Sequence, residues 1–368
     1  MVRLVAFDGQ RPVYIPTDPD DVADTLKVAT LGRELSRAEN RWSFTQLIKH
    51  SRAADHAEAD PTEPAGDDRQ ANDETTSDLP AALTAEPEAY GPEWSVAPGL
   101  EGLGGGTAFG NLVHEMFEHL DFTDADLPAA IADWLRTQRK FPVSEDQVAQ
   151  LPGLLTASVR TPFGPLFGDL SLSTLTMSNR LNELQFFLPI SPDAPFTARR
   201  IGEVVADHLE PGTLKDWAER LALGVSHVDL TGYMNGSIDL TLRFDGPAGP
   251  RYSVVDYKTN RLTSRGAEAT LADYHPDVLP EAMCHSNYVL QALLYNVALH
   301  RYLRWRLGDT YDPAVHLGPV GYLFVRGMVG PDTPTTADGT PSGVFAWQPP
   351  AGLVEALSEL LAGAEVAA

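Results

Sequence analysis

The sequence contains a single cysteine, Cys284, and no long uninterrupted apolar run. One cysteine excludes an internal disulfide framework and any zinc or iron–sulfur site built from four cysteines of one chain. A membrane-spanning helix needs about 20 consecutive apolar residues. The first residues, MVRLVAFDGQRP, have neither the apolar core nor the cleavage site of a signal peptide. We therefore expect a cytoplasmic protein that has no contact with a membrane.

Basic residues are also scarce, with 27 Lys and Arg against 51 Asp and Glu and a formal net charge of -24. Such a chain should hold nucleic acid weakly by itself, because Lys and Arg supply most non-specific affinity for phosphates. Part of the negative charge is local, since residues 55–93 contain twelve acidic residues and one arginine. This segment has few large apolar side chains, so burial cannot offset its ordering entropy. We predict a disordered acidic insert over residues 57–95.

A nucleotide-binding Walker loop, GxxxxGK[ST], is absent from the sequence. The stretch GLGGGTAFG (residues 102–110) is rich in glycine but lacks the lysine that would reach the phosphates. We therefore do not expect the chain to hydrolyse ATP.

The remaining sequence shows the periodicities of an α/β protein. GNLVHEMFEHL (residues 110–120) is typical of an amphipathic helix, and residues 285–307 predict a long helix. LQFFLPI (184–190) indicates a buried strand, and VGYLFVRG (320–327) a further one. SIDLTLRF (237–244) alternates apolar and polar residues and is followed by the turn segment DGPAGP and a second strand, RYSVVDYK. Helices around a central hairpin favour a mixed sheet flanked by helices.

Two carboxylates and one ammonium group should meet on this hairpin. Asp256 and Lys258 are two residues apart and leave the same strand face, while Tyr257 leaves the other. Asp239 lies on the polar face of the preceding strand. Two close carboxylates repel each other unless a cation lies between them, and Mg²⁺ is the usual cation beside phosphate. A surface ion pair on the hairpin is the alternative interpretation.

The two predicted helices offer further candidates. His114 could complete a metal shell, or it could form a surface or capping pair with Glu118 one turn later. On the long helix, Gln291 and Tyr295 lie on one stripe and could bond phosphate oxygens or a metal-bound water. The alternative is a helix that packs its aromatic side chains against the sheet.

Taken in order along the chain, these patterns resemble the RecB-type nuclease module of the PD-(D/E)XK superfamily. The matching residues are Gly110, His114 and Glu118 (GxxxHxxxE), Glu183, Gly236, Asp239 and Leu240 (GxxDL), Asp256, Tyr257 and Lys258 (DYK), and Gln291 and Tyr295 (QxxxY). The resemblance covers about Arg41 to Leu361, interrupted by the acidic insert.

The resemblance implies a restriction-endonuclease-like core. Residues 96–368 would be the nuclease domain, and residues 41–56 the first helix of the module. Residues 1–40 would be the end of the region that joins a motor to the nuclease. Because the motor itself is missing, the chain is expected to be a fragment of a larger subunit or a truncated relative.

The resemblance also implies a single site that cuts both strands of DNA in double-strand-break repair and recombination. One Mg²⁺ would be held by His114, Asp239, Asp256 and the Tyr257 carbonyl. Lys258 would serve the attacking water. Glu183, Gln291 and Tyr295 would complete the catalytic group. The expected partners are single- and double-stranded DNA ends, RecC- and RecD-like subunits and a RecA-like recombinase.

Two other functions are compatible with these residues. The chain could be a catalytically silent module that docks a RecC-like subunit or a recombinase, or it could be another PD-(D/E)XK enzyme, such as a restriction or Holliday-junction nuclease. Four intact candidate residues argue against a silent module. Iron–sulfur relatives are excluded because they need four cysteines.

Overall fold

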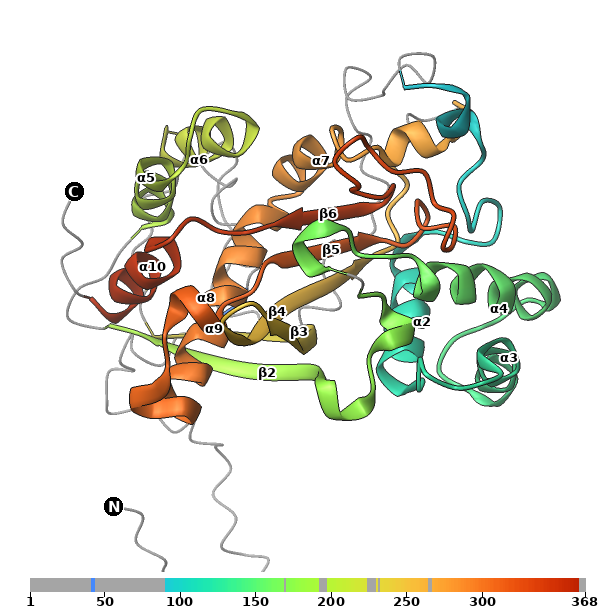
Figure 1. Cartoon of the computed structure of the whole chain (residues 1–368), viewed down its shortest axis with the longest axis horizontal. Helices are drawn as coiled ribbons and strands as arrows, with labels where there is room; N and C mark the ends of the chain where they lie inside the picture. Colours follow the sequence, from blue (N-terminus) through green and yellow to red (C-terminus); the bar gives the residue numbers. More distant parts are fainter. Residues whose placement is uncertain are drawn as a thin grey trace, which may run out of the picture. The chain divides into compact units, whose positions relative to one another are not determined.

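The computed structural model describes residues 41–43, 90–168, 170–191, 197–223, 230, 232–263 and 267–363. These residues form a mixed six-stranded sheet with helices on both faces (Figure 1). The predicted α/β class with a mixed, helix-flanked sheet is therefore confirmed. The predicted connecting region (1–40) lies outside the described residues, as does most of the acidic insert.

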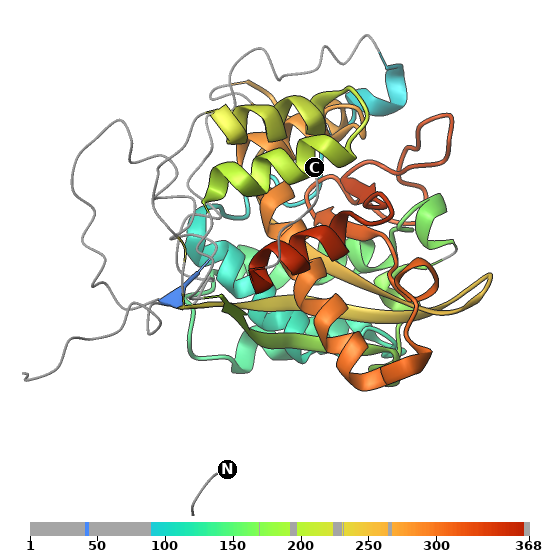
Figure 2. The same ribbon diagram turned by 90° about the vertical axis from the view of Figure 1, so that its left-hand side faces the viewer.

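The sheet is organised around one long antiparallel hairpin. Its strands are β1 (Arg41–Trp42), β2 (Arg180–Ile190), β3 (Gly232–Gly246), β4 (Gly249–Lys258), β5 (Val320–Phe324) and β6 (Val344–Trp347). The strand order is β1–β3–β4–β5–β6, and β2 also pairs with β3. The β1–β3 and β4–β5 pairs are parallel and the others antiparallel. In Figure 2, β1 (blue) lies at one end of the β3–β4 hairpin and the hairpin turn at the other.

Helices begin and end at recognisable signals. They are α2 (Gly106–His119), α3 (Leu127–Thr137), α4 (Glu145–Arg160), α5 (Ala198–His208), α6 (Thr213–Leu223), α7 (Leu279–His285), α8 (Tyr288–Leu307), α9 (Pro313–His316) and α10 (Leu353–Ala362). Short 3-10 turns are η7 (Pro92–Ser95), η8 (Pro165–Phe167), η9 (Leu172–Thr174), η10 (Met177–Asn179), η11 (Leu271–Tyr274) and η12 (Gly308–Thr310). Ser144 and Gln147 form a capping box at the start of α4. The predicted first helix is confirmed as α2, and the predicted long helix is confirmed as α8, which begins at Tyr288 after the separate short helix α7.

Each face of the sheet carries its own hydrophobic core. Helices α2, α3 and α4 pack on one face, drawn at the right in Figure 1, against side chains such as Leu240, Val255 and Tyr257. Helices α5 to α8 and α10 pack on the other face, against side chains such as Ile238 and Val254. Burial on both faces explains why β5, with the sequence VGYLF, is apolar throughout.

The β3 side chains change faces at Asp239. Ile238 belongs to the α8-side core, whereas Leu240, two residues on, belongs to the α2-side core. The prediction that the alternating apolar residues of this strand share one face is therefore wrong. On β2, Glu183 lies across from Asp239 and has a φ of 52°, a left-handed conformation that is rare for a non-glycine residue. The two strands are irregular at the same level, and simple alternation could not predict this.

Strand β2 is half exposed rather than buried as predicted. Leu188 and Ile190 lie in the α8-side core, but Phe187 has 62% of its surface exposed. The physical reason is position, because among the described strands β2 pairs only with β3 and the helices cover one face of this part of the strand.

The described chain begins with two short pieces. Arg41–Trp42 is a strand that pairs in parallel with β3, so the prediction of a helix is wrong for these two residues. The part of the helix predicted beyond Ser43 lies outside the described residues. At the end of the predicted insert, η7 buries Trp94 against Leu271 and Ala272. No helix in the described part of the chain is long and apolar enough to cross a membrane.

Candidate active site

The candidate site lies where β3 and β4 separate. The last paired residues are Leu240 and Val255, so the next residues along, Asp239 and Asp256, flank the opening between the strands. Asp256 is 2% exposed and Lys258 is 1% exposed. Both side chains lie on the α8 side of β4, whereas the ring of Tyr257 packs in the α2-side core. The structure thus brings together the carboxylates and the ammonium group that the sequence placed on this hairpin.

The Lys258 ammonium is enclosed by four side chains. Its Nζ lies 2.8 Å from Asp256 Oδ2 and 3.4 Å from Gln291 Oε1. The same atom lies 4.0 Å from the ring centre of Tyr288 and 5.5 Å from that of Tyr322. A carboxylate and two aromatic faces compensate for the loss of water around a buried cation. Lys258 is therefore held in one place.

The α8 candidates form a hydrogen-bonded chain that ends at Lys258. Gln291 Nε2 donates to the Tyr295 hydroxyl at 3.0 Å. The Tyr322 hydroxyl of β5 donates to Gln291 Oε1, also at 3.0 Å. Tyr322 was not predicted from the sequence. It reaches the site because β5 pairs in parallel with β4, which places Tyr322 beside Asp256.

His114 of α2 contacts the other carboxylate. Its Nδ1 lies 3.2 Å from Asp239 Oδ2, and the same oxygen accepts the Tyr257 backbone N–H at 3.2 Å. Burial opposes protonation, but the Asp239 carboxylate and, less strongly, Asp256 raise the pKa of His114 to about 9. Burial would raise the pKa of Asp239, yet His114, with help from Lys258, holds this pKa below its usual value. Both pKa shifts favour an imidazolium paired with a carboxylate.

Glu183 occupies the irregular position of β2 beside this pair. Its Oε2 accepts a hydrogen bond from the Ser237 hydroxyl at 2.7 Å. The left-handed backbone of Glu183 is a strained conformation of the type that persists where surrounding structure enforces it, often at functional sites. All the candidate residues therefore come from five elements that meet at one end of the hairpin: α2, β2, β3, β4 and α8.

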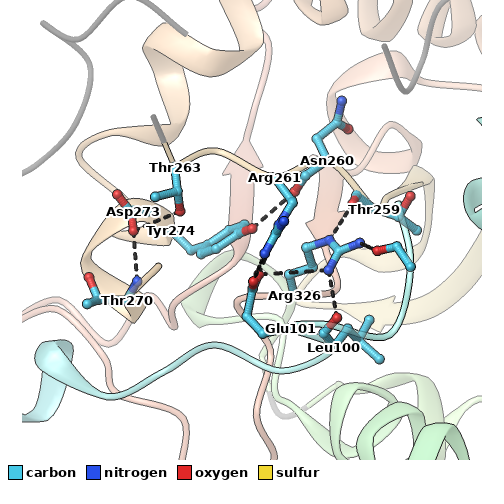
Figure 3. Close-up of polar contacts among 11 residues, drawn as sticks. Leu100, Glu101, Thr259, Asn260, Arg261, Thr263, Thr270, Asp273, Tyr274 and Arg326 are labelled. Carbon is cyan, nitrogen blue, oxygen red and sulfur yellow. Dashed lines mark hydrogen bonds and ion pairs between the residues drawn. The ribbon is translucent and has the colours of Figure 1, made fainter. Parts of the chain in front are cut away.

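A buried arginine ties the loop before α2 to the end of β4. The Arg326 guanidinium is fully buried and donates to the carbonyls of Thr259 (2.6 Å), Leu100 (2.8 Å) and Gly104 (2.6 Å), as Figure 3 shows in part. Three charge-assisted bonds from one rigid fork fix the positions of three backbone segments. The same loop leads into α2, so Arg326 indirectly sets the position of His114 relative to Lys258.

A second contact closes this cluster near the surface. Arg261 pairs with Glu101 of the same loop, and the Tyr274 hydroxyl donates to the Asn260 carbonyl at 3.1 Å (Figure 3). The residues that follow Lys258 are therefore anchored on both sides. A stable β4 end keeps the Asp256 and Lys258 side chains in register.

The predicted metal ligands have suitable chemistry but are engaged with each other. Two carboxylates, an imidazole and a backbone carbonyl are donors that suit a hard divalent cation. In this structure Asp239 pairs with His114, and Asp256 with Lys258. Within the described ranges, no three His, Cys, Asp or Glu side chains are grouped closely enough to hold a metal ion. A cation would have to replace the His114 proton and draw the carboxylates together.

Comparison with known proteins relates almost the whole chain to one subunit. No protein-family model matches the chain. The RecBCD enzyme subunit RecB of Mycolicibacterium smegmatis is 38% identical over 353 residues, or 94% of this chain. RecB of Mycobacterium tuberculosis is 40% identical over 367 residues, or 96% of this chain. RecB of Escherichia coli is 33% identical over 261 residues, or 70% of this chain.

The chain is a homologue of RecB. The matched part is 31% of the length of the M. smegmatis RecB and 30% of that from M. tuberculosis, so the chain spans about a third of these relatives. This homology agrees with the family resemblance found in the sequence motifs.

Proposed function

We propose that this chain is a Mg²⁺-dependent nuclease that hydrolyses phosphodiester bonds of DNA. The observation that carries the proposal is the convergence of Asp239, Asp256 and Lys258 at one buried end of the hairpin in a RecB homologue. Buried like charges are costly and are retained mainly where they do chemistry.

In this proposal Mg²⁺ is held by His114, Asp239, Asp256 and the Tyr257 carbonyl. When bound, it would polarise a phosphate oxygen and acidify a water molecule. Binding would require neutral His114, whose proton it would replace. The two carboxylates would gain a stronger counter-charge than the imidazolium gives them.

The chain's own residues would position the water and the developing charge. Lys258, held by Asp256 and the tyrosine rings, presents an ammonium that can orient the attacking water or neutralise negative charge in the transition state. Gln291 fixes the Lys258 ammonium through its amide oxygen, and Tyr295 fixes that amide. Glu183 would act at the edge of the site through its position beside Asp239.

Partners are part of the proposal because the chain is acidic. A net charge of -24 disfavours the approach of DNA, so delivery of the strand would come from RecC- and RecD-like subunits of a helicase–nuclease. The relatives' own name describes them as subunits of a RecBCD enzyme. A RecA-like recombinase is a further proposed partner in recombination.

The proposal is tested by cleavage of linear single-stranded DNA with Mg²⁺ and with EDTA. Wild-type chain should cut only with Mg²⁺. His114→Ala should raise the Mg²⁺ concentration for half-maximal cutting by at least about tenfold, because a ligand is lost. His119→Ala, an exposed histidine of the same helix, is the matched control and should behave as wild type.

A catalytically silent docking module is the alternative outcome. Wild-type chain that cuts no DNA, either alone or with RecC- and RecD-like subunits present, would favour it. Cutting that proceeds in EDTA would contradict the metal-dependent mechanism.

A further inference from the structure

The sheet face beside Glu183 and Asp239 carries two exposed aromatic rings. Phe187 on β2 is 62% exposed and Tyr233 on β3 is 47% exposed. Their neighbours Leu188 and Met234 point to the other face and are buried in the α8-side core. Phe186, also on that other face, meets the Tyr295 ring edge-on at 5.7 Å. One face of this part of the sheet is thus packed against α8, while Phe187 and Tyr233 lie exposed on the opposite face.

The open face forms a continuous row that ends at the candidate site. Its members, which we call the aromatic stripe, are Gln185, Phe187, Tyr233, Asn235 and Ser237. In the β2–β3 register, Phe187 lies opposite Asn235 and Gln185 opposite Ser237. Directly opposite residues share a face, so these side chains are neighbours. The next level of the ribbon is Glu183 and Asp239, and the Ser237 hydroxyl bonds to Glu183.

The chemistry of the stripe suits a single nucleic-acid strand. Exposed aromatic rings stack on bases of any sequence, and amide and hydroxyl groups bond base edges and phosphates. The five side chains of the stripe carry no formal charge in a chain with a net charge of -24, so this face does not repel phosphates as a typical face of this protein would. A protein partner would favour a larger contiguous apolar patch than two rings separated by polar groups.

We propose that the aromatic stripe binds the single DNA strand that enters or leaves the cleavage site. This inference rests on the proposed nuclease function and adds the path of the substrate. From Tyr233 to Asp239 the strand advances six residues, which is about 20 Å. That length is several times the 3.4 Å spacing of stacked bases. Bases would stack on the rings, while the cation proposed at the site would neutralise the phosphate to be cut.

The test combines a binding measurement with a cleavage measurement. Binding of a fluorescent oligothymidylate in EDTA is followed by anisotropy for wild type, Phe187→Ala, Tyr233→Ala and the double variant. Each single variant should bind the oligonucleotide about fivefold or more weakly than wild type, because stacking of a base on an aromatic side chain is worth about 1–3 kcal/mol. Both rings are exposed, so the variants should fold, and thermal melting checks this.

Trp305→Ala is the matched control, since Trp305 is 74% exposed but lies near the far end of α8. It should bind the oligonucleotide as wild type does. The ratio of wild-type to variant affinity should also stay constant between low and moderate salt. The stripe contains no Lys or Arg, and it would therefore release no counterions.

Cleavage separates this proposal from the function on which it rests. With Mg²⁺, the variants should show a raised KM for the oligonucleotide and unchanged hydrolysis of bis(p-nitrophenyl) phosphate, which is too small to reach the stripe. Equal oligonucleotide binding by wild type and the double variant, or no binding by wild type, would overturn the proposal that the stripe binds DNA, whether or not DNA is cut. Weaker binding by the variants in a chain that cuts nothing would uphold the stripe and refute the nuclease.

Discussion

Each acidic side chain at the centre of the candidate site lies beside a basic side chain. Asp256 with Lys258 and Asp239 with His114 form two ion pairs at the same end of the hairpin. Removing one member of a buried pair leaves the other uncompensated, which is costly. For this reason, variants of these residues need a folding control beside any activity measurement.

Sequence patterns could identify most of these residues but not all. The two-residue spacing of Asp256 and Lys258 fixes a shared strand face, whatever the rest of the fold. Tyr322 could not be found in this way, because its place beside Asp256 depends on the β4–β5 pairing of segments far apart in the chain. The contact of His114 with Asp239 likewise depends on how α2 packs on the sheet.

Tyr322 gives a prediction at the residue scale. Tyr322→Phe keeps the ring near Lys258 but removes the hydroxyl that donates to Gln291. We expect kcat for DNA cleavage to fall by about 2- to 10-fold with KM nearly unchanged, since one hydrogen bond is worth about 0.5–1.5 kcal/mol. Tyr311→Phe removes a hydroxyl bonded to His300 and serves as control. Equal loss of kcat in both variants would show a general effect of packing.

At the scale of elements, β2 and β3 both depart from regular strand geometry where they reach the candidate site. The left-handed Glu183 and the change of face at Asp239 occur across from each other. The existence and type of the main elements followed from the apolar patterns of the sequence. Helix α2 buries one stripe, whereas β5 and residues 288–300 of α8 are buried on all sides. The change of face did not follow, because a period of two assumes an undistorted strand.

The crossing of α5 and α6 provides a prediction about packing. A Cβ added at Gly202 would lie 2.6 Å from the Ala222 nitrogen and 2.8 Å from the Ala218 oxygen, both backbone atoms. Gly202→Ala should therefore lower the free energy of unfolding by about 1–3 kcal/mol. Gly153→Ala in α4 meets nothing within 4 Å and should raise it by about 0.5–1 kcal/mol. Urea unfolding measures the free energy of unfolding of both variants. A Gly202→Ala variant as stable as wild type would contradict the close approach of α5 and α6.

The whole molecule should lose stability in mild acid partly through His300. Burial, reinforced by Arg304 and Arg301, lowers the pKa of His300 from 6.5 to about 4, although Glu359 opposes this. The unfolded chain thus binds a proton that the folded chain does not between pH 6.5 and pH 4. Neutral His300 therefore contributes to the free energy of unfolding above pH 6.5, and this contribution is lost as the pH falls from 6.5 to 4.

Chemical denaturation at several pH values tests this prediction. His300→Gln should reduce the slope of unfolding free energy against pH between 6.5 and 4, whatever its effect at neutral pH. His119→Gln, at an exposed site, should keep the wild-type slope. The same slope in all three chains would show that His300 does not contribute.

For the whole molecule, the acidic composition bears on how DNA is delivered, and the buried site bears on how it is proposed to be cut. The chain is expected to need partners for DNA delivery, whereas the residues proposed to hydrolyse the phosphodiester bond all belong to this chain. The central claim is therefore that Asp256 and Lys258 carry out phosphodiester hydrolysis.

The most direct measurement is cleavage of linear single-stranded DNA with Mg²⁺ by wild type, Asp256→Asn and Lys258→Ala, with partner subunits present. Asp245→Asn, at an exposed position near the hairpin turn of β3, is the control. The account predicts that wild type and control cut, while both site variants melt cooperatively and lose cutting by at least about a hundredfold. Folded site variants that cut at the wild-type rate would contradict it.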